Sequence, residues 1–168
     1  MHTHGSIMRL KPRILFGALS MLAISHACAT QPLFDQYSDG QRVGYIFPAE
    51  CCYLELPDDR RIRNLRRKNM GSCSAAGGPV GVFRREGGKL LLTGLAECMG
   101  PIPLKALYAH LEGPVVATWL SGTFTARLNQ CYAEGLQLRY AVTQTLMIEK
   151  GVVKSVTETR NDVSECKF

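Results

Sequence analysis

Cysteines and a run of arginines are the residues whose types and spacing could do chemistry in this chain. Six of its seven cysteines form an even set suited to disulfide bonds: Cys51, Cys52, Cys73, Cys98, Cys131 and Cys166. A bond between the neighbours Cys51 and Cys52 lies outside normal bridge geometry, which leaves twelve possible pairings. Among these we expect Cys52–Cys73, Cys98–Cys131 and Cys51–Cys166. A redox pair at Cys51 and Cys52 is the alternative, but the sequence lacks a Cys-x-x-Cys motif.

The basic run lies at residues 60–68. It holds six positive charges and no negative one, on Arg60, Arg61, Arg63, Arg66, Arg67 and Lys68. Because each Lys or Arg close to an anionic membrane is worth about 1 kcal/mol, this run is a candidate binding site for phospholipid, lipopolysaccharide, another envelope polyanion or an acidic protein. The alternative is a solvated face that keeps the domain soluble. Nucleic acid is not the expected partner, since no aromatic residue interleaves the arginines.

Residues that could carry catalysis are sparse. His110 is the one histidine beyond residue 29, and its place near the end of an expected helix is better explained as a complement to the helix dipole. Four glutamates could supply an acid/base pair, but no spacing singles out two of them: Glu50, Glu55, Glu97 and Glu134. No motif for a cofactor or a metal is visible. The sequence therefore favours a protein that is not an enzyme, and we assign no catalytic residue.

The first twenty-nine residues are typical of an export signal. Basic residues at 9–13 precede an eleven-residue apolar run at 14–24, and small residues allow cleavage after Ala29. Met8 is an alternative start of the signal. Spanning a bilayer takes about 20 apolar residues, so a run of this length indicates a cleaved leader and not a membrane anchor.

The remaining residues, 30–168, have the size of a single domain. We expect this domain to be extracytoplasmic, in the periplasm or secreted; an outer-membrane lipoprotein with a lipid on Cys28 is the alternative. The formal net charge of the whole chain is +6. Without the three basic residues of the leader and the six at 60–68 the balance would be negative, so the positive charge of the domain is local.

Two hairpins are predicted by the pattern of apolar residues. Between Leu136 and Ile148 every even position is apolar except Gln144, which indicates a strand with one buried face. A turn then leads into a return strand at Val152–Arg160. The second hairpin pairs Val80–Arg84 with Lys89–Leu95, because the glycines between them supply the positive backbone angles that a tight turn needs.

Other elements complete the predicted fold. Val115–Leu128 is expected to be one long strand that crosses the middle of the sheet, and Arg42–Phe47 and Cys51–Leu56 are expected to be shorter strands. Helices are predicted at 103–111 and over the basic segment 57–71, where two apolar residues can face inward: Ile62 and Leu65. The fold class is therefore α+β: a twisted antiparallel sheet of about six or seven strands, with one or two short helices, stapled by disulfides.

These features favour a small exported binding protein of the bacterial cell envelope: an inhibitor, an immunity-like protector or an accessory component. Its partner would be a protein or an anionic envelope component, which includes a membrane surface, and segment 60–68 would engage it. One alternative is a hydrolase of envelope polymers that uses paired carboxylates. Another is a structural lipoprotein lipidated at Cys28. The sequence does not predict the oligomeric state.

Overall fold

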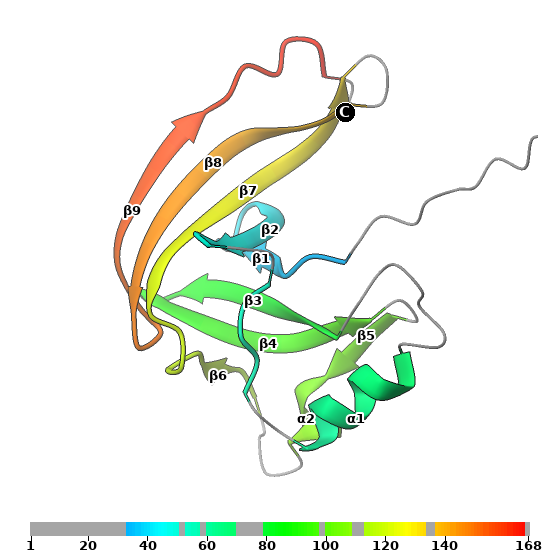
Figure 1. The fold of residues 1–168 in the computed structure, drawn as a ribbon. Coiled ribbons are helices and arrows are strands. Elements are labelled where there is room, and N and C mark those ends of the chain that lie inside the picture. The colour runs from blue at the N-terminus through cyan, green and yellow to red at the C-terminus, as the bar shows by residue number, and fades with distance from the viewer. Residues whose placement is uncertain are drawn as a thin grey trace, which may run out of the picture.

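The computed structural model describes residues 33–50, 53–57, 60–69, 79–97, 100–108, 113–133 and 137–166. These residues form a sheet of nine strands with two helices (Figure 1). The strands are β1 (Gln36–Ser38), β2 (Val43–Pro48), β3 (Val80–Glu86), β4 (Lys89–Glu97), β5 (Gly100–Pro103), β6 (Val115–Val116), β7 (Gly122–Ala133), β8 (Gln137–Glu149) and β9 (Val152–Arg160). The helices are α1 (Arg60–Asn69) and α2 (Leu104–Leu107).

The sheet closes on itself. Neighbouring strands follow the order β3, β1, β2, β7, β8, β9 and β4, and the β3–β4 hairpin completes the ring. Within the described residues, β1 and β3 are the one parallel pair. β9 meets β4 at a single register pair, Lys89 with Val152, next to a hydrogen bond of 2.8 Å from Leu90 N to Gly151 O. Beyond this point β9 leaves β4, and β7, β8 and β9 curve away together as an arm (Figure 1).

Apolar side chains fill the interior of the ring. The most deeply buried include Ile46, Phe83, Leu90, Leu128 and Leu146, and each such side chain contributes about 1.5–3 kcal/mol when it leaves water. The alternation predicted for β8 is confirmed, because its even positions from 142 to 148 are buried while Thr145, Met147 and Glu149 are exposed. The interior therefore includes Gln144, the polar residue that interrupts the apolar series.

Both predicted hairpins are confirmed. In the turn between β3 and β4, Gly87 and Gly88 have φ angles of 56° and 71°, a conformation that glycine adopts at little cost. The turn between β8 and β9 uses Lys150 and Gly151, with φ angles of 47° and 76°. A Cβ atom at Gly151 would lie 2.8 Å from the backbone of Ala117, so this turn also needs glycine for space.

The prediction of one long strand at 115–128 is wrong. β6 ends at Val116 and β7 begins at Gly122, and a tight turn closed by a hydrogen bond from Leu120 N to Ala117 O separates them. The chain changes partners here, because β6 pairs with β4 whereas β7 pairs with β2 and β8. Apolar residues on both faces gave no sign of this change.

The predicted strand at Cys51–Leu56 is also wrong, because the described residues 53–57 contain no strand. The backbone N–H of Leu54 donates to the carboxylate of Asp35 at 2.6 Å, and the N–H of Gly81 donates to the other oxygen of the same carboxylate at 2.6 Å. Asp35 is 1 % exposed. A buried carboxylate therefore replaces a strand ladder in holding this segment.

The helix expected at 103–111 is shorter in the structure. α2 ends at Leu107, because Tyr108 has φ and ψ angles of −122° and 78° and leaves the helix; His110 and Leu111 lie outside the described residues. Three short strands that no periodicity could reveal, β1, β5 and β6, raise the total to nine instead of six or seven. The domain is mostly β-sheet, so α+β describes it only roughly.

A disulfide joins Cys131 on β7 to Cys166, with 5.6 Å between their Cα atoms. The predicted pairs Cys98–Cys131 and Cys51–Cys166 are therefore wrong. The physical reason lies in the arm. After β9 the chain continues beside β8, where Asn161 N donates to Ala141 O, and so reaches the C-terminal end of β7. The pair Cys52–Cys73 lies outside the described residues, as do Cys28, Cys51 and Cys98.

Candidate functional site

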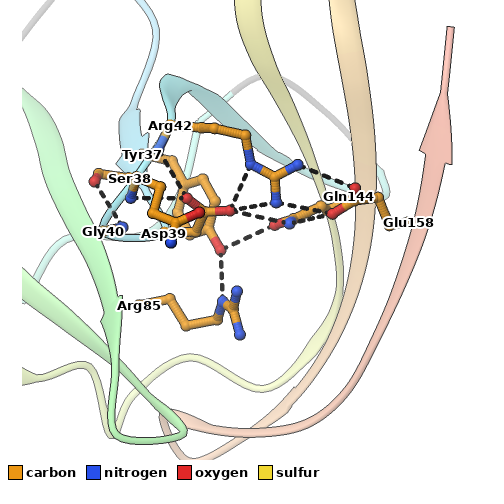
Figure 2. Close-up of polar contacts among 9 residues, drawn as sticks. Tyr37, Ser38, Asp39, Gly40, Arg42, Arg85, Gln144 and Glu158 are labelled. Carbon is orange, nitrogen blue, oxygen red and sulfur yellow. Dashed lines mark hydrogen bonds and ion pairs between the residues drawn. The ribbon is translucent and has the colours of Figure 1, made fainter.

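A network of polar side chains lies where β9 parts from the rest of the ring (Figure 2). Its members come from five parts of the chain: Tyr37 on β1, Asp39 and Arg42 in the β1–β2 turn, Arg85 on β3, Gln144 on β8 and Glu158 on β9. We call these six residues the polar network. Register brings two of them together directly, because Gln144 and Glu158 are partners in the β8–β9 ladder.

Arg42 lies between two carboxylates. Its Nε and Nη2 donate to Asp39 Oδ2 at 2.9 and 2.6 Å, and its Nη1 and Nη2 donate to the two oxygens of Glu158 at 3.0 and 2.8 Å. The turn itself orients Asp39, because its Oδ1 accepts the backbone N–H groups of Gln41 and Arg42. Gly40, with a φ angle of 94°, allows the chain to turn there.

Gln144 fixes the direction of the remaining hydrogen bonds. Its Nε2 donates to Asp39 Oδ2 at 3.2 Å and to Glu158 Oε2 at 3.0 Å, so its Oε1 is the atom that faces Tyr37. The Tyr37 hydroxyl therefore donates to Gln144 Oε1 at 3.2 Å and accepts from Arg85 Nε at 3.1 Å. Tyr37 and Gln144 are 2 % and 1 % exposed, which keeps this part of the network away from water.

The network shifts the pKa values of its titratable members. Burial on its own would raise the pKa of Asp39, but hydrogen bonds from the side chain and backbone of Arg42 and from the backbone of Gln41 outweigh burial and lower it. Hydrogen bonds from Arg42 and then Gln144 lower the pKa of Glu158 to about 2. Burial raises the pKa of Tyr37. At neutral pH the network therefore holds two carboxylates, two guanidinium groups and a neutral phenol.

The basic segment forms a helix, as predicted. α1 packs inward through Ile62, which is 2 % exposed, and through Leu65, which contacts the core. Arg60 and Arg63 are exposed on the same helix. Arg61, Arg66, Arg67 and Lys68 belong to α1, but their side chains lie outside the described part. In the view of Figure 1, α1 lies at the end of the molecule that carries α2 and β5.

Two of the candidate carboxylates share a cleft. Glu50 and Glu55 line a cleft of about 480 Å³ beside Tyr53 and Trp119. The Trp119 indole donates to the backbone carbonyl of Glu55 at 2.8 Å, so the wall of this cleft is fixed at that point. Glu97 lies on β4 and does not line this cleft. Glu134 lies outside the described residues.

The polar network was missed in the sequence, although one signal could have found it. Gln144 is the single polar residue among the even positions of β8, and a polar residue on a buried face needs hydrogen-bond partners. The other members lie in short or ordinary polar stretches and give no such signal. The sequence could therefore have indicated that a buried polar cluster exists, but not which residues complete it.

Comparison of the chain with protein-family models, with curated proteins and with solved structures gives no match. Neither helix of the described part is long and apolar enough to span a membrane. Within the same residues, no three His, Cys, Asp or Glu side chains are grouped so that they could hold a metal ion.

Proposed function

We propose that this protein is an exported binding protein of the cell envelope that engages an anionic surface through α1. The observation that carries the proposal is the way α1 is attached. Ile62 is buried and Leu65 contacts the core, while Arg60 and Arg63 face solvent. The helix is thus held by its apolar side, and six of its ten residues are basic.

The proposed binding depends on the density of positive charge on α1. Ten helical residues extend for about 15 Å, so the basic positions of α1 all fall within the footprint of a few lipid headgroups. At about 1 kcal/mol for each Lys or Arg near an anionic membrane, six residues supply at most about 6 kcal/mol. Salt would weaken this attraction, because the Debye length falls to about 3 Å at 1 M ionic strength.

Export belongs to the same proposal. The bond between Cys131 and Cys166 supports it, because disulfides form and persist in oxidising compartments. Mass spectrometry of the native protein tests this part. A chain that starts at residue 30 supports soluble release, and a diacyl group on Cys28 supports the lipoprotein alternative. A native chain with an intact leader and free thiols would contradict export.

Binding to vesicles tests the role of α1. We expect the protein to bind vesicles of phosphatidylcholine mixed with phosphatidylglycerol, and not vesicles of phosphatidylcholine alone. Replacing Arg60 and Arg63 by Gln removes two charges, or about 2 kcal/mol, and should weaken binding about 30-fold. The matched control replaces Lys89 and Arg139, which are exposed on β4 and β8. Equal losses in the two variants would show that overall charge matters and that α1 is not the site.

A hydrolase is the second candidate, because Glu50 and Glu55 line one cleft together with two aromatic residues. Aromatic rings beside a pair of carboxylates suit the binding and cleavage of a polysaccharide. Glu50→Gln and Glu55→Gln variants that stay folded should each lose activity on cell-wall polymer, whereas Glu149→Gln, on the exposed face of β8, should keep it. Absence of activity in the unaltered protein would remove this candidate.

A further inference from the structure

A second cleft lies beside the polar network, and no residue of α1 lines it. It lies between the β1–β2 turn and the β3–β4 turn and has a volume of about 590 Å³. This is within the range of small-molecule sites, which is about 300–1,000 Å³. Its lining includes Arg84 and Arg85 on β3, Glu86 beside them, and glycines from both turns: Gly40, Gly87 and Gly88.

Arg85 differs from the other charged residues around this cleft. Asp39 is paired with Arg42 at 2.6 Å, and Glu86 is paired with Arg84 at 2.8 Å. In the described part of the chain, Arg85 has one hydrogen bond, from its Nε to the Tyr37 hydroxyl, and its two terminal nitrogens bond to no side chain drawn in Figure 2. Among the described residues that line the cleft, Arg85 is thus the one cation without an ion-pair contact to a carboxylate.

The network also fixes the orientation of that group. Arg85 Nε can bond only to an acceptor, and the Tyr37 oxygen is one because its proton is committed to Gln144. Gln144 is committed in turn, because its amide nitrogen donates to Asp39 and Glu158. Tyr37 is 2 % exposed, so water does not compete at this hydroxyl. The hydrogen bond to Tyr37 therefore restrains the guanidinium group before any ligand arrives.

The glycines that line the cleft are surrounded by open space. A Cβ atom built at Gly40, Gly87 or Gly88 would meet nothing within 4 Å. A guanidinium group with both terminal nitrogens available matches two oxygens of a carboxylate or phosphate, which gives a bidentate, charge-assisted pair. We propose that this cleft binds the carboxylate or phosphate group of a small ligand, with two of its oxygens on Nη1 and Nη2 of Arg85.

Titration of the full-length ¹⁵N-labelled protein with inorganic phosphate, and separately with acetate, tests the proposal. We expect saturable shifts of the amide signals of Gly40, Gly87 and Gly88 with at least one of the two anions, and the anion that gives them identifies the ligand group. Arg85→Gln should weaken that binding about tenfold or more. Arg85→Lys, which keeps the charge but not the two-pronged geometry, should fall in between.

Two further variants separate the proposal from simple charge effects. Tyr37→Phe keeps the ring and removes the acceptor that orients Arg85, so we expect weaker binding although the charge at position 85 is unchanged. The double variant Arg84→Gln with Glu86→Gln removes the neighbouring ion pair without changing the net charge, and binding should be retained.

Absence of saturable shifts with both anions would overturn the proposal, and so would undiminished binding by Arg85→Gln. Equal loss in the double variant would show that binding depends on the Arg84–Glu86 ion pair and would contradict a site centred on Arg85. Vesicle binding by Arg85→Gln should equal that of the unaltered protein. This site and the role of α1 can therefore fail independently.

Discussion

The polar network and α1 use arginine in opposite ways. Arg42 is shared between two carboxylates, and Asp39, its nearer partner, has a side chain only 4 % exposed. Arg60, in contrast, is exposed on a helix with no acidic residue in its first turn. In the network the charge is used within the molecule, to join β9 to the β1–β2 turn. On α1, the Arg60 side chain is exposed to solvent.

A positive charge in a small domain can therefore have two roles: it can stabilise the fold, or it can bind a partner. A guanidinium group between carboxylates stabilises one arrangement of strands, and its removal leaves an unpaired charge inside the protein. A guanidinium group on an exposed helix contributes little to stability. Stability measurements should therefore respond to the network, whereas binding measurements should respond to α1.

The largest effect is expected from Arg42→Gln. The substitution leaves Asp39 without its cation, and removing one partner of a fully buried pair costs about 3–5 kcal/mol. Water reaches Arg42, whose side chain is 24 % exposed, so we expect a decrease of about 3 kcal/mol in the free energy of unfolding. Arg60→Gln is the matched control on α1 and should stay within about 0.5 kcal/mol of the unaltered protein. Urea unfolding of both variants measures this, and similar losses would remove the distinction between the two regions.

A smaller effect is expected from Gln144→Leu. The substitution places an apolar side chain of similar size in the interior but leaves the buried Tyr37 hydroxyl without its acceptor, which costs about 2 kcal/mol. The matched control is Thr145→Ala, one residue further along β8 on the exposed face, where we expect a loss of less than about 1 kcal/mol. If Gln144→Leu is as stable as the unaltered protein, the network does not hold the strands together.

What the sequence could predict follows from how each feature is encoded. The alternation along β8 and the glycines at 87 and 88 are local signals, and both hairpins were predicted from them. α1 was predicted in the same way, from a possible cap at Asp58, basic residues toward the end of the segment and Gly71 after it. Each of these patterns is complete within about fifteen residues, so no tertiary information was needed.

The polar network is encoded differently. Tyr37 and Gln144 are 107 positions apart, and Arg42 and Glu158 are 116 positions apart. They meet because the ring closes, and the closure depends on β1, a strand of three residues without a readable period. The bond between Cys131 and Cys166 was missed for the same reason, since it follows from the way the chain returns along β8 after β9. Closure, and with it the site, could not be inferred from local patterns.

The smallest of the expected effects is on the pH dependence of stability in acid, which should come from the network and not from α1. Hydrogen bonds from Arg42 and Gln144 lower the pKa of Glu158 from its usual 4.5 to about 2, and Asp39 shifts in the same direction. A carboxylate whose folded pKa is depressed adds stability that is fully present above its unfolded pKa and is lost as the pH falls through the folded pKa. The midpoint of thermal unfolding should therefore be level above about pH 4.5 and decline toward pH 2.

Glu158→Gln removes one of the two carboxylates of the network. The midpoint of thermal unfolding of this variant should therefore decline less steeply between pH 4.5 and pH 2 than that of the unaltered protein. Arg60→Gln leaves the network intact, so its decline should be as steep as that of the unaltered protein. Parallel curves for Glu158→Gln and the unaltered protein would mean that the ion pair with Arg42 does not form in solution. In that case Arg42 would belong with the exposed arginines of α1, and the contrast between the two regions would be lost.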